Sequence, residues 1–319
     1  MLPQNLWFFL LLILTTLTIP AQAASPRVLV SIKPIHSLVA GVMQGVAEPD
    51  LLIKGTQSPH TFNLRPSDVK KLNSAELIIW VGEGFETFLT HTLASLPSQT
   101  RIVQLMGHAG VAQLPIRQGG VWEKPHHHRK QETTEVPHTA NRNEPHESDP
   151  HIWLSPTNAR TIVSIIKEKL SEIDPDNAAR YQQNARNLKI QLNKLDQELL
   201  ERLSKVQWVP FIVFHDAYQF FERHYKLNVI GSITLSPDRA PGAKRIHEIR
   251  AKLKKLEARC IFSEPQFEPK LIKTIVEGTE VRTGSLDPLG AALPAGTEAY
   301  FSLMRNLTNQ LVACLEEKS

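Results

Sequence analysis

The sequence predicts an α/β protein of two lobes, each with a central, mostly parallel sheet flanked by helices, joined by one long rigid helix. Two observations indicate the lobes: strand and helix patterns alternate near the N-terminus, and they alternate again in the last third of the chain. Such alternation is typical of βα units around a parallel sheet. A third observation indicates the connection, because a long charged stretch with one narrow apolar stripe separates the two regions.

The N-terminus carries an apolar run at residues 6–19, followed by Ala21-Gln22-Ala23 and a first charged residue at Arg27. This is the layout of a secretory signal peptide, so we expect residues 1–23 to be cleaved off after Ala23. The run is short for a membrane-spanning helix. No Lys or Arg precedes it, which leaves a retained signal-anchor as the alternative.

Composition narrows the range of partners. The 319 residues carry a formal net charge of +4, with no patch of Lys and Arg interleaved with aromatic residues. Nucleic acid is therefore not an expected partner. A mature length of roughly 300 residues suggests two domains or one large domain, and a hydrophobic content of 41% provides ample core.

The predicted first lobe covers residues 24–173. Its apolar and polar patterns alternate, with Pro34 and Pro66 at positions suited to the first turn of a helix. The predicted strands are residues 27–32, 51–53 and 77–81, and the predicted helices are residues 34–43, 66–75 and 157–173.

A composition break interrupts this lobe at residues 117–149. Apolar residues nearly vanish there, and no helical or strand period survives. Such a segment buries too little surface to offset the entropy of ordering it, so we predict a disordered, histidine-rich loop inside the lobe. Its histidines are candidates for an auxiliary, low-affinity metal site: His126, His127, His128, His138 and His146.

The predicted linking helix covers residues 174–206. Asp174 and Pro175 suit the N-cap and the first helical position. The apolar residues from Ala178 to Leu203 alternate in steps of three and four, which places them on one face. About thirty residues at 1.5 Å each span about 45 Å, enough to cross a whole lobe. The alternative is a helix that forms a coiled coil with a partner.

The predicted second lobe covers residues 207–319. Residues 209–214, 260–264 and 281–286 are predicted strands, and residues 297–317 a final helix. Its two cysteines, Cys260 and Cys314, are the only ones in the chain. In an exported protein such a pair predicts one disulfide, whereas in a reducing compartment they would be two core thiols.

Three histidines share a context at the ends of predicted strands or the starts of helices. His60 follows Ser-Pro, His151 lies in Asp-Pro-His-Ile-Trp-Leu-Ser-Pro, and His215 ends an apolar strand. Open α/β sheets bind ligands at the carboxyl ends of their strands, and neutral imidazole is a strong zinc ligand. On pattern alone, however, each of them could equally be a hydrogen-bonded structural histidine.

Several segments resemble one known family. They are SIKPIHSLVAGVM, GTQSPHTFNLRPSDVKKLNSAELIIWVG, DPHIWLSP, FHDAYQFF and GSLDPLG, running from residue 31 to about 290. The sequence is similar to the zinc-specific solute-binding proteins of ABC importers (cluster A-I, ZnuA-like).

The resemblance implies that His60, His151 and His215 bind the metal, with Asp287 in the family's fourth ligand position. It implies a monomeric periplasmic protein that captures Zn²⁺ as its transported ligand. The zinc would pass to a membrane permease that works with a cytoplasmic ATPase.

Among the proteins that the sequence resembles, the residue at the position of His215 distinguishes zinc binders from manganese binders. Manganese-binding relatives typically carry a carboxylate there, whereas this chain carries His215. More nitrogen and less carboxylate oxygen favours zinc. Asp287 has an alternative role as a turn residue before Pro288, in which case water would complete the site.

Other functions stay open as alternatives. A manganese-type adhesin relative is one, although no cysteine near the predicted cleavage site is available for a lipid anchor. A zinc-dependent hydrolase is another, but no HExxH motif is present, so we expect no enzyme. Two further features have alternative roles. Glu264 is expected to accept a hydrogen bond from a ligand imidazole or to form an ordinary contact between the lobes. The histidine-rich loop would collect zinc or sense it, or it would be merely a solvated insertion.

Overall fold

The computed structural model describes residues 25–117, 148–234, 242–255, 257–267 and 270–316. Within these residues, two four-stranded parallel sheets form the centres of two lobes, which confirms the predicted fold class. Their strand orders are β2-β1-β3-β4 and β6-β5-β7-β8, so both sheets share one topology. The strands are β1 Val28–Val30, β2 Asp50–Leu51, β3 Leu77–Trp80, β4 Arg101–Gln104, β5 Phe211–His215, β6 Val229–Thr234, β7 Cys260–Ser263 and β8 Arg282–Ser285.

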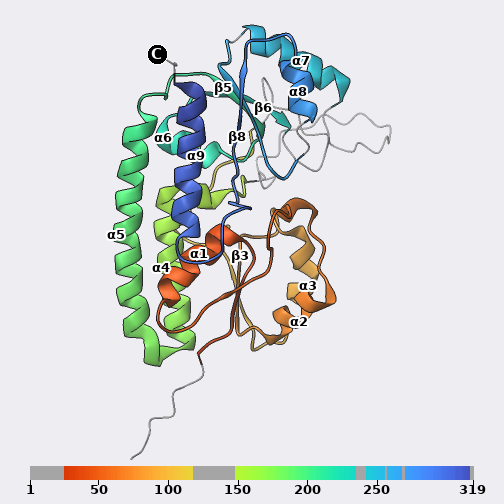
Figure 1. Ribbon diagram of the computed structural model, residues 1–319. Helices are drawn as coiled ribbons and strands as arrows, with labels where there is room; N and C mark the ends of the chain where they lie inside the picture. Colours follow the sequence, from red (N-terminus) through yellow and green to blue (C-terminus); the bar gives the residue numbers. More distant parts are fainter. Residues whose placement is uncertain (1–24, 118–147, 235–241, 256, 268–269, 317–319) are drawn as a thin grey trace, which may run out of the picture.

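Helices follow most of these strands and pack around the sheets (Figure 1). Within the described residues they are α1 Lys33–Met43, α2 Pro66–Ser74, α3 Thr90–Ala94, α4 Pro156–Ile173, α5 Ala178–Leu203, α6 Gln219–Tyr225, α7 Ala243–Lys255, α8 Lys270–Val276 and α9 Ala299–Leu315. Short 3₁₀ turns precede or join some of them: η1 Pro59–Thr61, η2 Thr87–Leu89, η3 Ile152–Leu154 and η4 Pro175–Asn177. None of the helices in this part of the chain is long and apolar enough to cross a membrane.

Helix α5 runs alongside both lobes (Figure 1). Its 26 residues bury the predicted apolar stripe and expose the charged faces. It packs against α1 and α4 of the first lobe and against α9 from the end of the chain. The predicted capping role of Asp174 takes a different form, because its carboxylate accepts hydrogen bonds from the side chains of Asn177 and Tyr181.

One hydrophobic core is continuous through the two lobes. Val30 of β1, Leu195 of α5, Phe211 of β5 and Tyr300 of α9 all belong to it. A second, smaller cluster lies in the second lobe, where Ile212 and Ile233 pack with residues of α7 and α8. The lobes therefore share a core and are not two separate bodies on a flexible tether.

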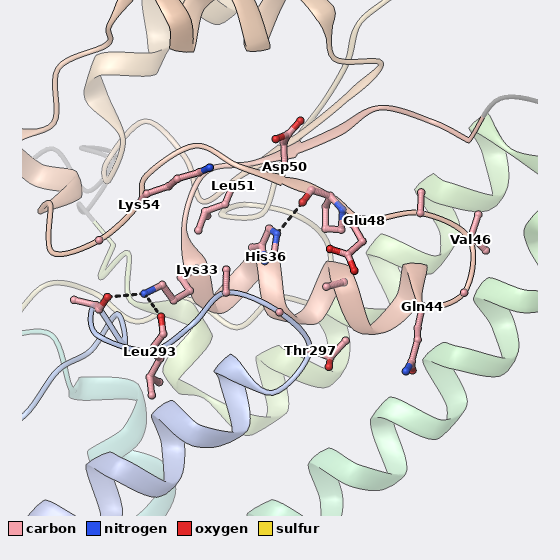
Figure 2. Close-up of a pocket in the computed structure, with 18 residues that line it drawn as sticks. Lys33, His36, Gln44, Val46, Glu48, Asp50, Leu51, Lys54, Leu293 and Thr297 are labelled. Carbon is pink, nitrogen blue, oxygen red and sulfur yellow. Dashed lines mark hydrogen bonds between the residues drawn. The ribbon is translucent and has the colours of Figure 1, made fainter.

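The α1 helix also contacts the segment between β8 and α9 (Figure 2). The buried Lys33 ammonium donates hydrogen bonds of 2.6–2.7 Å to the carbonyl oxygens of Gly290, Ala291 and Leu293. Three carbonyl acceptors match the three donors of an ammonium group. These bonds replace the water that a buried charge would lose, and they fasten the first lobe to the second.

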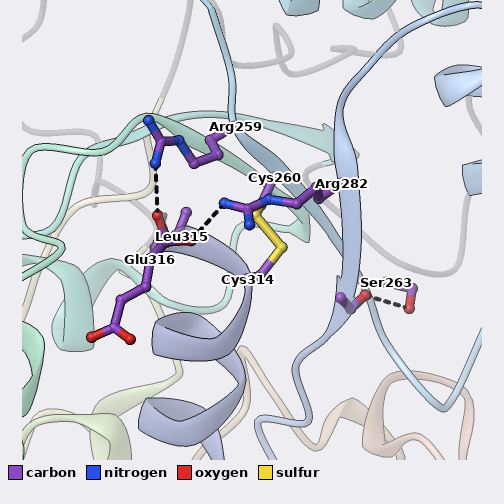
Figure 3. Close-up of a disulfide and its surroundings, with 8 residues drawn as sticks. Arg259, Cys260, Ser263, Arg282, Cys314, Leu315 and Glu316 are labelled. Atoms are coloured by element: carbon purple, nitrogen blue, oxygen red, sulfur yellow. Dashed lines mark hydrogen bonds between the residues drawn. A yellow bond between two sulfur atoms is a disulfide. The ribbon is translucent and has the colours of Figure 1, made fainter. Parts of the chain in front are cut away.

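The predicted disulfide between Cys260 and Cys314 is present, with its two Cα atoms 6.3 Å apart. It joins the start of β7 to the last turn of α9 (Figure 3). Two arginines support the same junction, since Arg259 donates to the Leu315 carbonyl and Arg282 to the Glu316 carbonyl. Cationic donors at the C-terminal end of a helix satisfy its free carbonyls and complement its dipole.

Candidate metal centre

Three histidines from separate elements meet between the lobes. His60 lies in η1 after β2, His151 immediately precedes η3, and His215 is the last residue of β5. One ring nitrogen of each histidine lies within 4.8 Å of the corresponding nitrogens of the other two. Within the described part of the chain, they form the one group of His, Cys, Asp or Glu residues arranged to hold a metal ion.

The Asp-Pro-His-Ile-Trp-Leu-Ser-Pro segment positions His151 by local bonds at both ends. Its backbone N–H donates to the Asp149 carboxylate at 3.0 Å, which closes a tight turn. At the other end, Ser155 accepts from the backbone N–H of Asn158 and begins α4, with Pro156 at the first turn. Such a cap is typical of a helix N-terminus, and it places His151 just ahead of a rigid helix.

Two of the imidazoles are oriented by carboxylates. Nδ1 of His151 lies 2.7 Å from Asp149 Oδ1, and Nδ1 of His215 lies 2.6 Å from Glu264 Oε1. We assign the ring proton to Nδ1 in each case because a carboxylate can only accept. Nε2 of each ring then presents its lone pair. Glu264 thus accepts from an imidazole, as in the first of its two expected roles, and such carboxylate–imidazole pairs are typical of metal-binding histidines.

The Nε2 atoms of His151 and His215 lie 3.3 Å apart. With both lone pairs facing each other, the contact is unfavourable unless a cation lies between them. Two zinc–nitrogen bonds of about 2.0–2.1 Å at a tetrahedral angle span about 3.3–3.4 Å. The observed separation therefore matches one edge of a zinc coordination tetrahedron.

Burial keeps His151 uncharged. His151 and His215 are only 4% and 3% exposed. Burial, followed by the repulsion of His215, lowers the pKa of His151 well below its ordinary value. A neutral imidazole is the form that binds metal, so this donor is ready for a cation at neutral pH. Burial also raises the pKa of Asp149 to about 7.

Aromatic side chains wall the cluster. The ring of Phe85 contacts those of His60 and Trp153 with centroid distances of 5.0 and 5.1 Å. Trp153 Nε1 donates to the Pro288 carbonyl at 2.8 Å, which links this wall to the second lobe. The cavity that they line has a volume of about 10 Å³. That is room for a single ion or water molecule, not for an organic substrate.

Asp287 lies outside the donor group. Its carboxylate accepts hydrogen bonds from Gln266 Nε2 and from the backbone N–H groups of Leu289 and Ala291, at 2.6–3.0 Å. This is the turn role that the sequence left open for it. The five histidines of the auxiliary site lie outside the described residues, as does the predicted cleavage site at Ala23.

A larger open groove of about 890 Å³ lies beside α1 and the segment before α9 (Figure 2). Lys33, His36, Lys54 and Thr297 are among its lining residues, but none of the three clustered histidines reaches it. His36 points its Nε2 at the Pro49 carbonyl, at 2.9 Å. The groove is therefore separate from the metal centre.

A two-lobed α/β fold with a small nitrogen-donor site between the lobes defines a binding protein for a divalent metal. Residues 28–314 match the family model described as ZnuA, zinc-uptake complex component A, periplasmic. The chain belongs to the ZnuA family.

Relatives support this assignment over the full length. The chain is 43% identical to the high-affinity zinc uptake system protein ZnuA of Brucella suis, over 91% of this chain and 92% of that protein. It is 35% identical to the ZnuA of Yersinia pestis, over 99% and 100% of the two chains. The structure of the periplasmic zinc binding protein TroA from Treponema pallidum has the same fold, with a TM-score of 0.75 at 22% identity, covering 92% of this chain and all of that one.

Proposed function

We propose that this protein is the high-affinity, periplasmic zinc-binding subunit of an ABC importer. It captures Zn²⁺ through His60, His151 and His215 and delivers it to a membrane permease that works with a cytoplasmic ATPase. The main support for this proposal is the donor geometry. Three imidazole nitrogens lie within 4.8 Å of one another, and carboxylates orient two of the rings so that Nε2 faces inward.

The donor set favours zinc over manganese. The cluster offers three nitrogens and includes no carboxylate among the described residues. Imidazole suits zinc, whereas manganese prefers carboxylate and water oxygen. The same argument weighs against a manganese-binding adhesin.

Capture without catalysis is the function that this site supports. The ZnuA family is a family of solute-binding proteins, not a class of enzymes. A zinc hydrolase would need space for a substrate and a free general base beside the metal. The cavity holds about 10 Å³, and the nearby Asp149 and Glu264 are already engaged with imidazole Nδ1–H groups.

The fourth coordination position belongs to Asp287 or to water. Asp287 would have to exchange some of its three hydrogen bonds, from Gln266, Leu289 and Ala291, for a bond to the metal. A water molecule would need no such rearrangement, and the cavity has room for one.

The proposal also covers export, the division into lobes and the histidine-rich segment. Export with cleavage after Ala23 places the protein in the periplasm, as a monomer. The first lobe covers residues 24–173, the linking helix 174–206 and the second lobe 207–319. The histidines His126, His127, His128, His138 and His146, within residues 117–149, supply an auxiliary, low-affinity zinc collector that is not essential for binding at the main site.

Substitution of the clustered histidines tests the function. His60→Ala, His151→Ala and His215→Ala should each weaken zinc binding more than about 100-fold, since each removes a direct ligand, and even partners of ligands cost about 10–100-fold. Competition with a chromophoric chelator at pH 7.5 measures the change. In the first lobe, His91 is exposed and His108 is half-buried, and neither belongs to the cluster, so their Ala variants are the controls. Three site variants with wild-type zinc affinity would refute the proposal.

The same titration decides the fourth position. If Asp287 binds the metal, Asp287→Asn should lose affinity to an extent similar to the histidine variants. If water occupies that position, the variant should stay within about tenfold of the wild type, as for a partner outside the coordination sphere.

A further inference from the structure

Arg117 of the first lobe places its guanidinium in the second lobe. Its backbone follows Pro115, which forms an isolated antiparallel bridge with Ser148. Asp149, the partner of His151, comes next along the chain and donates its backbone N–H to the Leu114 carbonyl at 2.8 Å. Arg117 is thus attached to the same local structure that carries His151.

The guanidinium holds two carboxylates of the second lobe. Nε and Nη2 donate to the two carboxylate oxygens of Asp216, and Nη1 and Nη2 donate to those of Glu222. The Nη1–Oε2 distance is 2.6 Å and the Nε–Oδ2 distance is 3.0 Å. Two fork-to-fork pairs on one arginine fix its orientation more firmly than a single point contact would.

All three partners are largely removed from water. The side chains of Arg117, Asp216 and Glu222 are 22%, 6% and 7% exposed. Burial raises the pKa of Glu222 to about 7, and Arg117 opposes that rise. Removing one partner of a buried ion pair leaves an uncompensated charge, which is far costlier than losing an exposed pair.

The carboxylate partners lie next to a proposed zinc ligand. Asp216 directly follows His215, and the backbone turns tightly there because Ala217 N–H donates to the His215 carbonyl at 2.8 Å. Helix α6, which carries Glu222, starts four residues after His215. Gln219 of this helix donates to the Pro115 carbonyl at 3.0 Å, a second bond between the same two segments.

We propose that Arg117 is a positioning residue for the metal centre. By clamping Asp216 and Glu222, it fixes His215 of the second lobe against His151 of the first, and so sets the affinity for zinc. The inference rests on the proposed function, because it takes both histidines as zinc ligands. It assigns the clamp a role in metal binding in addition to any role in stability.

Four variants test this role. Arg117→Met removes the clamp, Arg117→Lys keeps the charge without the fork, and Arg117→Met/Glu222→Gln also removes one unpaired buried carboxylate. Arg305→Met is the control for loss of an arginine elsewhere, since Arg305 forms a bidentate but more exposed pair with Glu198 that links α9 to α5 without touching the cluster. Each full-length variant is assayed for zinc affinity by chelator competition and for the Tm of the metal-free protein.

We expect Arg117→Met to weaken zinc binding about 10–100-fold, the range for partners that orient ligands. Arg117→Lys should recover part of the affinity, because an ammonium replaces the charge but not the two planar forks. The double variant should recover the Tm lost in Arg117→Met without recovering the affinity. Recovery of Tm without recovery of affinity would distinguish a positioning role from a purely stabilising one. Arg305→Met should leave the affinity unchanged.

Unchanged affinity in Arg117→Met, or an equal loss in Arg305→Met, would overturn the role of Arg117. So would recovery of affinity in step with Tm in the double variant, since stability alone would then explain the loss. If Arg117→Met does not fold, Arg117→Lys decides, and full affinity in it contradicts the need for the forks. These results are independent of the histidine variants, whose failure would instead remove the proposed function.

Discussion

At the scale of single residues, buried acids outside the three-histidine group hold the surroundings of the candidate metal centre in place. Asp149 and Glu264 orient imidazoles, and Glu86 orients the loop that carries the aromatic wall. Both carboxylate oxygens of Glu86 accept backbone hydrogen bonds, from Val81 at 3.1 Å and Gly82 at 2.8 Å. The adjoining Phe85 packs on the His60 ring. Each acid thus holds a neighbouring group in place at the cost of its own desolvation.

Glu86 should give stability a distinct pH dependence. Burial raises its pKa from 4.5 to about 7. The folded state therefore binds more protons than the unfolded state between these values, and its stability falls as the pH rises through them. In Glu86→Gln, which resembles the protonated form, this loss should be absent.

The Tm of the metal-free protein, measured by calorimetry at pH 5 and pH 8, checks this expectation. The Tm of the wild type minus that of Glu86→Gln should be smaller at pH 8 than at pH 5. The amide loses one acceptor oxygen at every pH, so a constant offset between the proteins does not affect the test. A difference that grows with pH would contradict the burial argument.

At the scale of elements, α9 of the second lobe is tied to both halves of the molecule. Its C-terminal turn is bonded to β7 by the Cys260–Cys314 disulfide, and it receives donors from Arg259 and Arg282 (Figure 3). Along its length it packs on α1 and α5. Its Tyr300 hydroxyl also donates to the Trp153 carbonyl beside the metal centre. The disulfide therefore anchors a helix that crosses between the lobes.

Removing this bond should lower stability but not zinc affinity. We expect Cys260→Ser/Cys314→Ser to lose about 2–5 kcal/mol in the free energy of unfolding, because the unfolded chain regains the entropy of a long loop. Urea denaturation at pH 7.5 measures the loss. Reductant should destabilise the wild type and leave the double variant unaffected. A large fall in zinc affinity would show that the bond positions the metal centre as well.

At the scale of the whole molecule, the lobes are connected by more than a hinge. Helix α5 packs along both of them, and the core is continuous through it. Lys33, Trp153 and Arg117 add hydrogen bonds between the lobes at three separate places. Lobes free to move would instead have a small, polar interface. Metal release is therefore expected to require local rearrangement around the histidines, not wide opening.

Removal of zinc should leave the overall dimensions unchanged. Small-angle X-ray scattering of the zinc-loaded protein and of the chelator-treated protein should give the same radius of gyration within error. The reason is that separating the lobes would expose the shared apolar core. A clear increase on zinc removal would contradict this and would indicate a hinge.

Much of the fold was predictable from local pattern. Residues 27–32, 77–81 and 209–214 are mostly apolar, and the central strands β1, β3 and β5 form there. Edge strands β4 and β6 were not predicted. Strand β4 has the mixed sequence RIVQ with Ile102 exposed, and β6 contains Gly231. An edge strand is buried on fewer sides, so its sequence need not be apolar throughout.

The metal centre, like the fold, was only partly predictable from the sequence. His60, His151 and His215 were predicted because strand-end context and family resemblance agree on them. The Asp149–His151 pair was visible in the sequence as a two-residue spacing but was not assigned. The clamp formed by Arg117 had no local signal, because its partners lie 99 and 105 positions away.

The sequence by itself determined the fold class, the long helix, the cysteine pair and the three histidines. Each depends on local pattern, on a single available pairing, or on motifs that the family shares. Only the tertiary structure decided that Asp287 hydrogen-bonds within its turn, that Asp149 and Glu264 orient the imidazoles, and that Arg117 bridges the lobes. These are contacts of particular atoms, and most join residues far apart in the chain. Packing, not composition, brings such atoms within bonding distance.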